Sequence, residues 1–332
     1  MAILVCGGAG YIGSHYVRAL RERGETPVVL DNFLSGHAAS VPADVCLHAG
    51  DMRDPALLES VFSRHAVDAV VHFAASSLVG ESMERPLEYF HNNVHGMQVL
   101  LEAMVRHRVG KIVFSSTASV YGEPERIPIV EDSPLRPASP YGESKLFMER
   151  MTAWAGKAHG IRSVILRYFN VAGAWPGGEI GEDHQPESHL IPLVLQVPLG
   201  RRRYVTIFGD DWPTPDGTCI RDYLYVMDLV DAHVRAVDYL HGGGSSIVCN
   251  LGNGTGFSVR QIVDAASRVT GMPVAAEVGP RHARDPACLV ASAERARQVL
   301  GWQARAGIEE IIASAWAWHQ AHPHGFEDRA QR

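Results

Sequence analysis

A tyrosine and a lysine four residues apart, Tyr141 and Lys145 in the segment SPYGESK, have the types and spacing for proton transfer. A nearby ammonium favours the phenolate form of a phenol, which could then act as a base. Ser139 and Pro140 indicate a helix start, because serine caps free N–H groups and proline has no N–H to lose there. Residues at i and i+4 share one helix face. An ordinary surface helix would show the same pattern, so other segments must distinguish a catalytic pair from two surface residues.

Glycines at positions 7, 10 and 13 follow an apolar run and lead into a helical pattern that begins near Tyr11. Glycine allows a tight turn and a close backbone approach, and a helix N-terminus attracts a pyrophosphate. The next apolar run ends in Asp31, whose carboxylate could accept hydrogen bonds from ribose hydroxyls and would repel a 2′-phosphate. This spacing predicts a site for NAD rather than NADP, although a glycine-rich turn without a ligand remains the alternative.

Three further strand ends are candidates for cofactor contacts. Asn32 could add a hydrogen bond, and Asp51 and Met52 in GDMRD would lie near an adenine ring. The small residues of HFAASS would let the backbone approach the cofactor. In each case an ordinary loop at a strand end would look the same.

The elements that must position these residues alternate along the first half of the chain. Short apolar runs at 3–5, 28–30, 67–73, 111–115 and 161–169 are separated by helical patterns such as 91–108. This alternation predicts βαβ units and an α/β fold with a Rossmann-like, doubly wound parallel sheet. After Val171 the chain becomes rich in glycine and proline. A smaller, loop-rich α/β lobe is expected from there.

The composition narrows the classes of function. The 332 residues include 46% hydrophobic and 20% charged residues, with a net charge of −7. A mildly acidic chain is not an obvious partner of nucleic acid or of an anionic membrane. No run approaches the ~18 apolar residues of a membrane span, and the first residues lack the features of a signal peptide. The five scattered cysteines contain no C-x-x-C and are expected to be free thiols of a cytoplasmic protein.

These segments occur in the order found in a known family. The chain resembles the UDP-glucose 4-epimerase family of the extended short-chain dehydrogenase/reductase superfamily. The likeness covers nearly the whole chain, through GGAGYIGSH, HFAA, FSSTASVYG, SPYGESK, LRYFNVAGA, HLIP, IFG, DGTCIRDYLYVMDL and NLGNG. The glycine spacing and Y-x-x-x-K mark only the superfamily, whereas LRYFNVAGA followed by DGTCIRDY is more specific to the epimerases.

The resemblance implies a role for each matching residue and no metal site. The catalytic positions are Tyr141, Lys145 and Thr117. The cofactor positions are Gly7, Gly10, Tyr11, Ile12, Gly13, Asp31, Asn32, Asp51, Met52, Phe73, Ala74, Ala75, Ser77, Asn92, Lys145 and Phe169, with Ser77 standing where relatives carry a lysine. The substrate positions are Thr117, Tyr141, Asn170, His189, Leu190, Phe208, Arg221, Arg281, His282 and Asp285.

Two positions depart from the family's pattern. In GPRHARDP, His282 occupies the place of an arginine that is expected to hold the pyrophosphate, and Arg281 or Arg284 could supply the missing charge. Leu289 occupies the gate associated with room for an N-acetyl group. Acceptance of N-acetylated sugars, of pentoses and of thymidine rather than uridine nucleotides therefore stays open.

The implied function is the NAD-dependent interconversion of UDP-glucose and UDP-galactose in galactose metabolism. Tyr141 would remove the proton of the sugar C4 hydroxyl while Thr117 hydrogen-bonds the same oxygen and Lys145 holds the nicotinamide ribose. The 4-keto sugar formed by oxidation would rotate and receive the hydride on its other face. A UDP-N-acetylhexosamine or UDP-pentose 4-epimerase is the alternative, and a noncatalytic NAD-binding sensor is the alternative from another class.

Further expectations concern reaction type, domains and assembly. Thr117 is followed by Ala118 and Ser119 rather than by the acidic residues of dehydratases. We expect residues 1–172 with 222–252 to form an NAD-binding Rossmann domain, and 173–221 with 253–332 a nucleotide-sugar-binding domain.

The stretches 91–108 and 141–154 carry apolar residues on more than one face, and relatives dimerise through such helices, so a homodimer is expected.

Overall fold

The computed structural model describes residues 1–281 and 286–326. Its centre is a seven-stranded parallel sheet with the order β11-β6-β5-β4-β1-β2-β3. The strands are β1 (Ala2–Cys6), β2 (Thr26–Asp31), β3 (Cys46–Ala49), β4 (Val67–His72), β5 (Lys111–Thr117), β6 (Arg162–Tyr168) and β11 (Ile247–Leu251). Their apolar runs are almost wholly buried, as expected when helices cover both faces of a parallel sheet.

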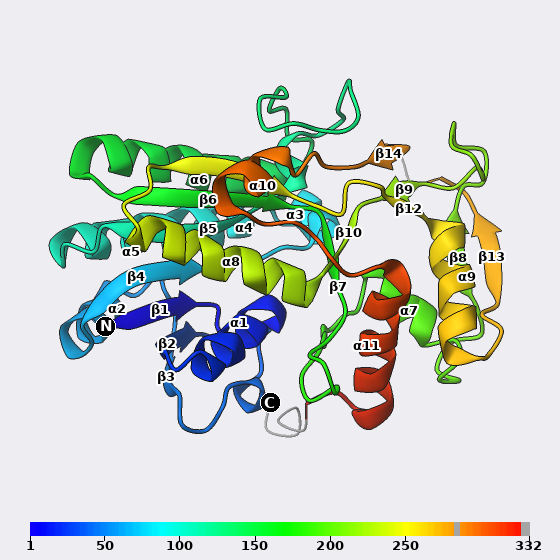
Figure 1. Cartoon of the computed structure of the whole chain (residues 1–332), viewed down its shortest axis with the longest axis horizontal. Coiled ribbons are helices and arrows are strands. Elements are labelled where there is room, and N and C mark those ends of the chain that lie inside the picture. Colours follow the sequence, from blue (N-terminus) through cyan, green and yellow to red (C-terminus); the bar gives the residue numbers. More distant parts are fainter. Residues whose placement is uncertain (282–285, 327–332) are drawn as a thin grey trace.

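Helices cover both faces of the sheet (Figure 1). One face carries α1 (Tyr11–Glu22), α8 (Val226–His241) and α10 (Glu294–Leu300). The other carries α2 (Pro55–Arg64), α5 (Gly96–Arg106) and α6 (Pro140–His159). The short helices α3 (Val79–Glu84) and α4 (Pro86–Tyr89) precede a π-helical segment, η2 (Phe90–His95), that continues into α5; η1 (Ala38–Ser40) and η3 (Ala118–Val120) are single 3₁₀ turns.

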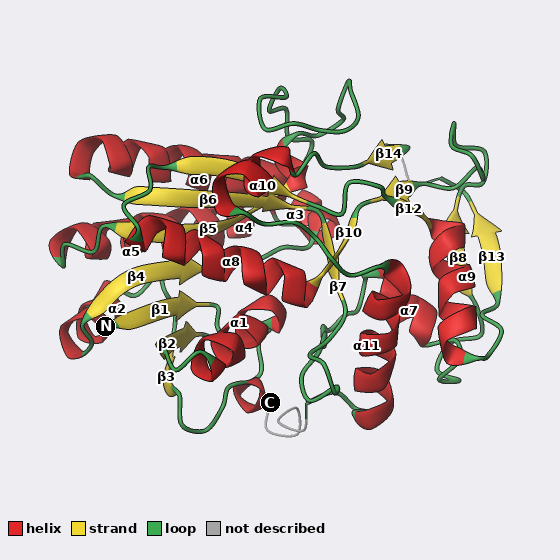
Figure 2. Ribbon diagram, viewed as in Figure 1, coloured by secondary structure: helices red, strands yellow, loops and turns green. Residues whose placement is uncertain are grey.

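The second lobe contains three small sheets, which Figure 2 shows beside the main one. Its strands are β7 (Asn170–Ala172), β8 (Val205–Phe208), β9 (Ile220–Arg221), β10 (Tyr223–Tyr225), β12 (Phe257–Ser258), β13 (Ala276–Gly279) and β14 (Cys288–Leu289). Its helices are α7 (Leu190–Leu195), α9 (Val259–Thr270) and α11 (Ile308–Ala321), which share one apolar core.

The prediction of a Rossmann-like α/β fold is confirmed. Each of the five apolar runs read from the sequence lies in a strand of the main sheet. The strand β11 also belongs to this sheet, as the expected return of residues 222–252 to the first domain requires. Because α10 packs on β11 and α8, with Leu300 and Trp302 in their core, we propose that 294–302 belong to the first domain. The strands β7 and β10 form a sheet of their own and pack in the core of α7, α9 and α11, so we propose that 170–172 and 223–225 belong to the second domain.

The start of α6 follows the expectation. The Ser139 hydroxyl accepts a hydrogen bond from the Gly142 N–H at 3.1 Å, and Pro140 is the first helical residue. The helix stops at Gly160, which has φ +75°, a conformation that glycine adopts without steric strain. The catalytic pair read from the sequence therefore lies on the first turns of a well-capped helix.

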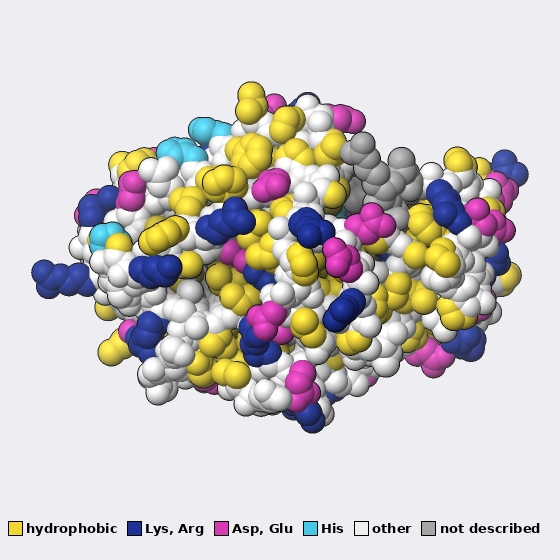
Figure 3. All heavy atoms as spheres, turned by 90° about the horizontal axis from the view of Figure 1, so that it is seen from above, with side chains coloured by type: hydrophobic (Ala, Val, Ile, Leu, Met, Phe, Trp, Pro, Cys, Tyr) yellow, Lys and Arg dark blue, Asp and Glu magenta, His cyan; other side chains and the backbone are white. Residues whose placement is uncertain are grey.

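The surface and the cysteines agree with the composition. Figure 3 shows acidic and basic side chains interspersed with apolar ones on one face. Within residues 1–281 and 286–326, no helix combines the length and apolar character needed to cross a bilayer. All five cysteines are free thiols.

Candidate active site

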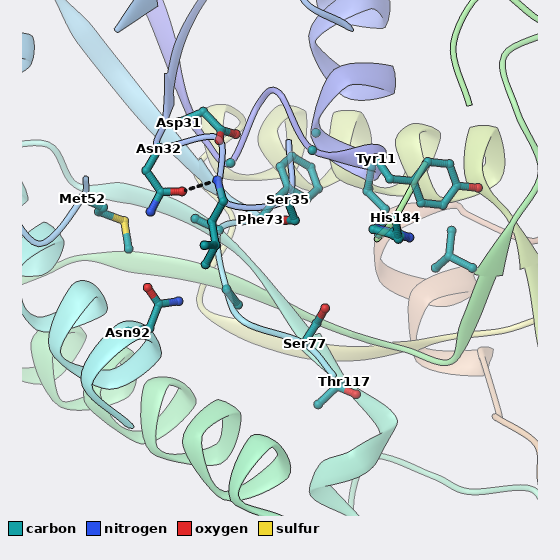
Figure 4. Close-up of a pocket in the computed structure, with 18 of the residues that line it drawn as sticks. Tyr11, Asp31, Asn32, Ser35, Met52, Phe73, Ser77, Asn92, Thr117 and His184 are labelled. Carbon is teal, nitrogen blue, oxygen red and sulfur yellow. Dashed lines mark hydrogen bonds between the residues drawn. The ribbon is translucent and has the colours of Figure 1, made fainter. Parts of the chain in front are cut away.

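A pocket lies at the carboxyl ends of the main sheet, where the strand order reverses beside β1. In doubly wound sheets this is the crevice that binds ligands. All sixteen predicted cofactor residues line it, as do the predicted substrate residues Thr117, Tyr141, Asn170 and His189. Figure 4 shows Asp31, Asn32 and Met52 toward one end and Tyr11 and His184 toward the other.

The glycine loop leaves room for a phosphate group. Gly7 has φ +78°, and a Cβ built on it would lie 2.6 Å from the Ala74 N, while one on Gly13 would overlap the carbonyl oxygen of Gly7. The helix α1 that follows has no side-chain cap and no acidic residue in its first turn. An anion at this N-terminus would meet open N–H groups and the positive end of the helix dipole. The loop thus fits a pyrophosphate.

Asp31 holds the turn at the end of β2. Its two carboxylate oxygens accept hydrogen bonds from the Ala9 N–H at 2.9 Å and the Phe33 N–H at 2.8 Å. Asn32 accepts one from the Leu34 N–H at 3.0 Å (Figure 4). A carboxylate oriented by two backbone donors on the pocket lining is well placed to receive ribose hydroxyls.

Arg53, which the sequence analysis missed, lies beside the predicted adenine contacts. Its guanidinium donates to both carboxylate oxygens of Asp51, at 2.8 and 2.5 Å, and this pairing lowers the pKa of Asp51 well below its usual range. Arg53 also contacts His91 at 2.8 Å. The loop between β3 and α2 is therefore stiffened by its own charges, with Met52 buried against Gly96.

The three predicted catalytic residues come together from β5 and α6. Thr117 is the last residue of β5, and its side chain hydrogen-bonds Tyr141. Lys145, which is 3% exposed, donates to the Ser115 carbonyl oxygen at 2.9 Å. Its ammonium also lies 5.1 Å from the centre of the Phe114 ring. Strand and helix together thus place a hydroxyl, a phenol and an amine in the pocket lining.

The Lys145 ammonium together with an oxidised nicotinamide ring was expected to lower the pKa of Tyr141, and the protein by itself acts in the opposite direction. Burial raises the pKa of Tyr141 above its usual value, and the hydrogen bond to Thr117 only partly opposes this. Burial also lowers the pKa of Lys145 to about 7, although Glu149 acts in the opposite direction. Desolvation disfavours the charged form of both groups and outweighs the attraction expected from their spacing.

A buried asparagine fixes the loop that follows β4. The Asn93 side chain accepts from the Ser76 N–H at 2.9 Å and donates to the Ser76 carbonyl oxygen at 3.0 Å. It also donates to the Ser144 hydroxyl of α6 at 2.9 Å. The neighbouring Asn92, a predicted cofactor residue, donates to the Ser76 hydroxyl at 3.1 Å. Loop and catalytic helix are therefore held by one residue of η2.

Four residues of the loop before α7 form a charged cluster at the other end of the pocket. His189 Nδ1 lies 2.9 Å from Glu182 Oε1 and 3.0 Å from Glu187 Oε1, and His184 Nδ1 lies 3.2 Å from Glu182 Oε1. Although burial opposes it, the carboxylate of Glu182 and the hydrogen bonds of both glutamates raise the pKa of His189 to about 10. The pKa of Glu182 is lowered, against its burial, by the two histidines. His189 is thus a cation in the pocket lining.

Four further predicted substrate residues, Leu190, Phe208, Arg221 and Arg281, lie outside this lining. Leu190 packs against the core of the second lobe, and Phe208 is 43% exposed at the end of β8. Arg221 donates to the Pro286 carbonyl oxygen at 2.8 Å, and Arg281 pairs with Asp211 at 2.5 Å. His282, Arg284 and Asp285 lie outside the described residues. These six assignments remain predictions.

Several lining residues were not predicted from the sequence: Leu30, Leu34, Ser35, Gly50, Arg53, Tyr168, Val171, Glu182 and His184. Tyr168 directly precedes the predicted Phe169, and the ends of β5 and β6 lie side by side. Its position at a strand end was the available signal. Glu182 and His184 lie in a loop whose sequence has no periodic pattern, so only its fold brings them to the pocket.

Comparison with known proteins finds a matching family and similar curated proteins. Residues 3–252 match the model of the NAD dependent epimerase/dehydratase family. The chain is similar to a curated UDP-glucose 4-epimerase of Halalkalibacterium halodurans, with 55% identity over 98% of both chains. A Streptococcus mutans protein of the same name is 55% identical, over 99% of this chain and 100% of its own.

Solved structures are similar over the same length. A crystal structure of a UDP-glucose 4-epimerase superposes with a TM-score of 0.97 at 53% identity, covering 98% of this chain and 100% of the other. The Bifidobacterium longum UDP-glucose 4-epimerase in complex with NAD⁺ and UDP has a TM-score of 0.93 at 38% identity, with the same coverage.

Proposed function

The chain belongs to the NAD dependent epimerase/dehydratase family, and from this membership and the pocket we infer that it interconverts UDP-glucose and UDP-galactose in an NAD-dependent reaction. The observation that carries this function is the meeting, in one pocket, of an open glycine cradle at α1 with Thr117, Tyr141 and Lys145. The cradle matches the pyrophosphate of a dinucleotide, and the trio matches the proton transfer that oxidation of an alcohol requires.

Each residue of the pocket has its own role in the proposed reaction. Thr117 and Tyr141 share a hydrogen bond and converge on one substrate oxygen, from which the Tyr141 phenolate takes a proton. Lys145, anchored on the Ser115 carbonyl oxygen, stays beside the cofactor's ribose. Gly7, Gly10 and Gly13 hold the pyrophosphate, and Asp31 accepts the adenosine ribose hydroxyls. When bound, NAD accepts a hydride from the sugar C4 and returns it to the opposite face.

The protonation state of Tyr141 depends on the charges around it, which come from Lys145 and from the cofactor. Since burial raises the pKa of Tyr141 and lowers that of Lys145 to about 7, the phenolate needs positive charge from the bound, oxidised nicotinamide ring. The base is then available only when the cofactor is oxidised. This coupling suits an enzyme that starts every turnover with NAD⁺.

Substrate selection is assigned to the end of the pocket lined by His189 and Asn170. The His189 imidazolium there can pair with a diphosphate, a role that the family's pattern gives to an arginine at the position where this chain has His282. Leu289 and the lining residue Phe169 both pack against the cluster that contains Val120 and Tyr121. UDP-N-acetylhexosamines and UDP-pentoses are therefore tested alongside the hexoses.

A homodimer is part of the proposal, although its basis has changed. Met97, Leu101, Met104, Leu146 and Met148, which suggested an uncovered face, are buried in the chain's own core. The first lobe itself covers them, through α2, α5 and α6. Phe147, which also suggested that face, is 47% exposed, as are Val79 at 47%, Met83 at 54%, Leu87 at 80% and Trp154 at 67% on α3, α4 and α6. We place the dimer interface on this apolar surface.

A coupled assay tests the function. Purified protein is given UDP-galactose, UDP-GlcNAc or UDP-xylose, with and without added NAD, and formation of the C4 epimer is followed together with net NADH. Conversion of UDP-galactose without net NADH is expected. Stoichiometric NADH would instead indicate a dehydrogenase, and absence of any turnover with bound NAD would indicate the sensor.

A further inference from the structure

A cysteine and two histidines meet at the edge of the main sheet, outside the pocket. Cys46 and His48 lie two residues apart on the edge strand β3, so both side chains leave the same face of the sheet. His65 is the C-cap of α2, which follows β3 in the chain. Figure 1 shows β3 and α2 on the side of the molecule nearest the N-terminus. None of the three residues lines the pocket.

The three potential ligand atoms point at one another. His48 Nε2 and His65 Nε2 are 2.9 Å apart, and Cys46 Sγ lies 3.6 Å from His48 Nε2 and 3.8 Å from His65 Nε2. A tetrahedral zinc ion with its usual bond lengths separates two nitrogens by about 3.3 Å and a nitrogen from a sulfur by about 3.6 Å. Shifts of a few tenths of an ångström would give this geometry.

We propose that Cys46, His48 and His65 bind one divalent transition-metal ion, with zinc as the natural occupant and water as the fourth ligand. A thiolate with two imidazoles favours zinc, copper or cobalt over magnesium or calcium, which prefer oxygen ligands. Cys46 is exposed and the two histidines are half-buried, so an ion and its water can reach the site from solvent.

A ring-to-ring hydrogen bond is the competing explanation for the contact between the two histidines. One neutral imidazole can donate to the other, which accounts for their 2.9 Å separation without a metal. That explanation gives the thiol no role. Metal binding needs all three side chains, and this difference separates the two explanations.

A bound ion would join the start of β3 to the end of α2. The loop between these elements contains Gly50, Asp51, Met52 and Arg53, all of which line the pocket. The ion would therefore cross-link β3 and α2 and stabilise this folded unit, because it binds the native arrangement and not the unfolded chain. Turnover does not depend on it, since no ligand touches the reaction site.

Cobalt(II) is the probe for the test. Full-length protein is stripped with a chelator and titrated with Co²⁺ while absorbance is recorded. We expect one equivalent per chain, tetrahedral d–d bands and a thiolate-to-cobalt charge-transfer band, and Zn²⁺ should displace the cobalt. Since even outer-shell partners are worth about 10–100-fold in metal affinity, Cys46→Ser, His48→Ala and His65→Ala should each weaken binding at least ~10-fold.

The control is Cys288→Ser, which alters the other cysteine that is not fully buried and should keep the bands. Zn²⁺ should also raise the unfolding temperature of the unaltered protein and of Cys288→Ser, but not of Cys46→Ser. All these variants should retain epimerase turnover. Equal cobalt affinity in the unaltered protein and Cys46→Ser would overturn the proposal in favour of the hydrogen bond alone, as would loss of the charge-transfer band in Cys288→Ser.

Discussion

Burial governs the titration of the two groups that carry the proposed proton transfer. The Lys145 ammonium and an oxidised nicotinamide ring were expected to favour the Tyr141 phenolate, whereas burial in the protein raises the pKa of the phenol and lowers that of the amine. The distance between two charged groups does not by itself set their pKa values, because burial also disfavours the charged form of each group. The oxidised cofactor is then the charge that activates the base.

Replacing Tyr141 by Phe should leave ligand binding intact and slow the reaction. The phenyl ring preserves the packing, but it removes the group that exchanges the proton, which is worth at least ~100-fold in rate. Turnover measured by the coupled assay, and NAD and UDP affinities measured by calorimetry, check this. Near-normal turnover would contradict the role of Tyr141.

His189 gives a prediction about pH. Its folded-state pKa is raised from 6.5 to about 10, so the ion pair contributes its full stability below about pH 6.5 and loses it as the pH rises through about 10. The difference in unfolding temperature between the protein and His189→Gln should therefore be largest near pH 6 and shrink toward pH 10. Thermal unfolding at a series of pH values measures it. A difference that grew with pH would exclude this pairing.

At the scale of elements, the segment η2 has a function that a regular helix would not allow. Its π-helical turn lies between α4 and α5 and carries Asn92 into the pocket lining and Asn93 onto the Ser76 loop and α6. Single π-turns of this kind are frequent at functional sites. The π-helical turn thus links the pocket wall that carries Asn92 to the helix that carries Tyr141.

Asn93→Leu should therefore destabilise the protein and weaken NAD binding. It leaves the part-buried N–H and carbonyl of Ser76 and the buried hydroxyl of Ser144 without this partner, at a cost of about 1–3 kcal/mol. Chemical denaturation and NAD titration measure the two effects. Gln98→Leu is the matched control, because Gln98 is exposed on α5 and pairs only with Glu102. Equal losses in both variants would show that Asn93 has no special role.

At the scale of the whole molecule, the exposed apolar surface on α3, α4 and α6 is the proposed dimer interface. Phe147→Glu with Trp154→Glu should shift the protein from dimer to monomer, because desolvating two carboxylates opposes burial of that face. Sedimentation at micromolar concentration measures this. Val278→Glu, a change at a 51% exposed side chain of β13, is the control and should leave the dimer intact. A monomeric unaltered protein would remove the dimer proposal.

Local spacing was enough to predict much of this protein. The Ser-Pro helix start before Tyr141, the glycine loop at positions 7, 10 and 13, and the strand runs all depend on neighbours within a few residues. Such short-range patterns act the same way in any compact fold. For this reason the sheet, the capped helix, the glycine loop and Asp31 could be anticipated from local spacing. Cofactor positions such as Asn92 and Phe169 were expected only from the resemblance to the family.

Contacts between distant segments were decided only by the tertiary structure. The contact of Cys46 with His65 and the hydrogen bond of Asn93 to Ser144 join residues that are 19 and 51 positions apart. The pairing of Glu182 with His189 lies within one loop, but it depends on how that loop folds. Burial likewise set the pKa values of Tyr141 and Lys145. Desolvation depends on everything that surrounds a group, and no spacing along the chain records what those surroundings will be.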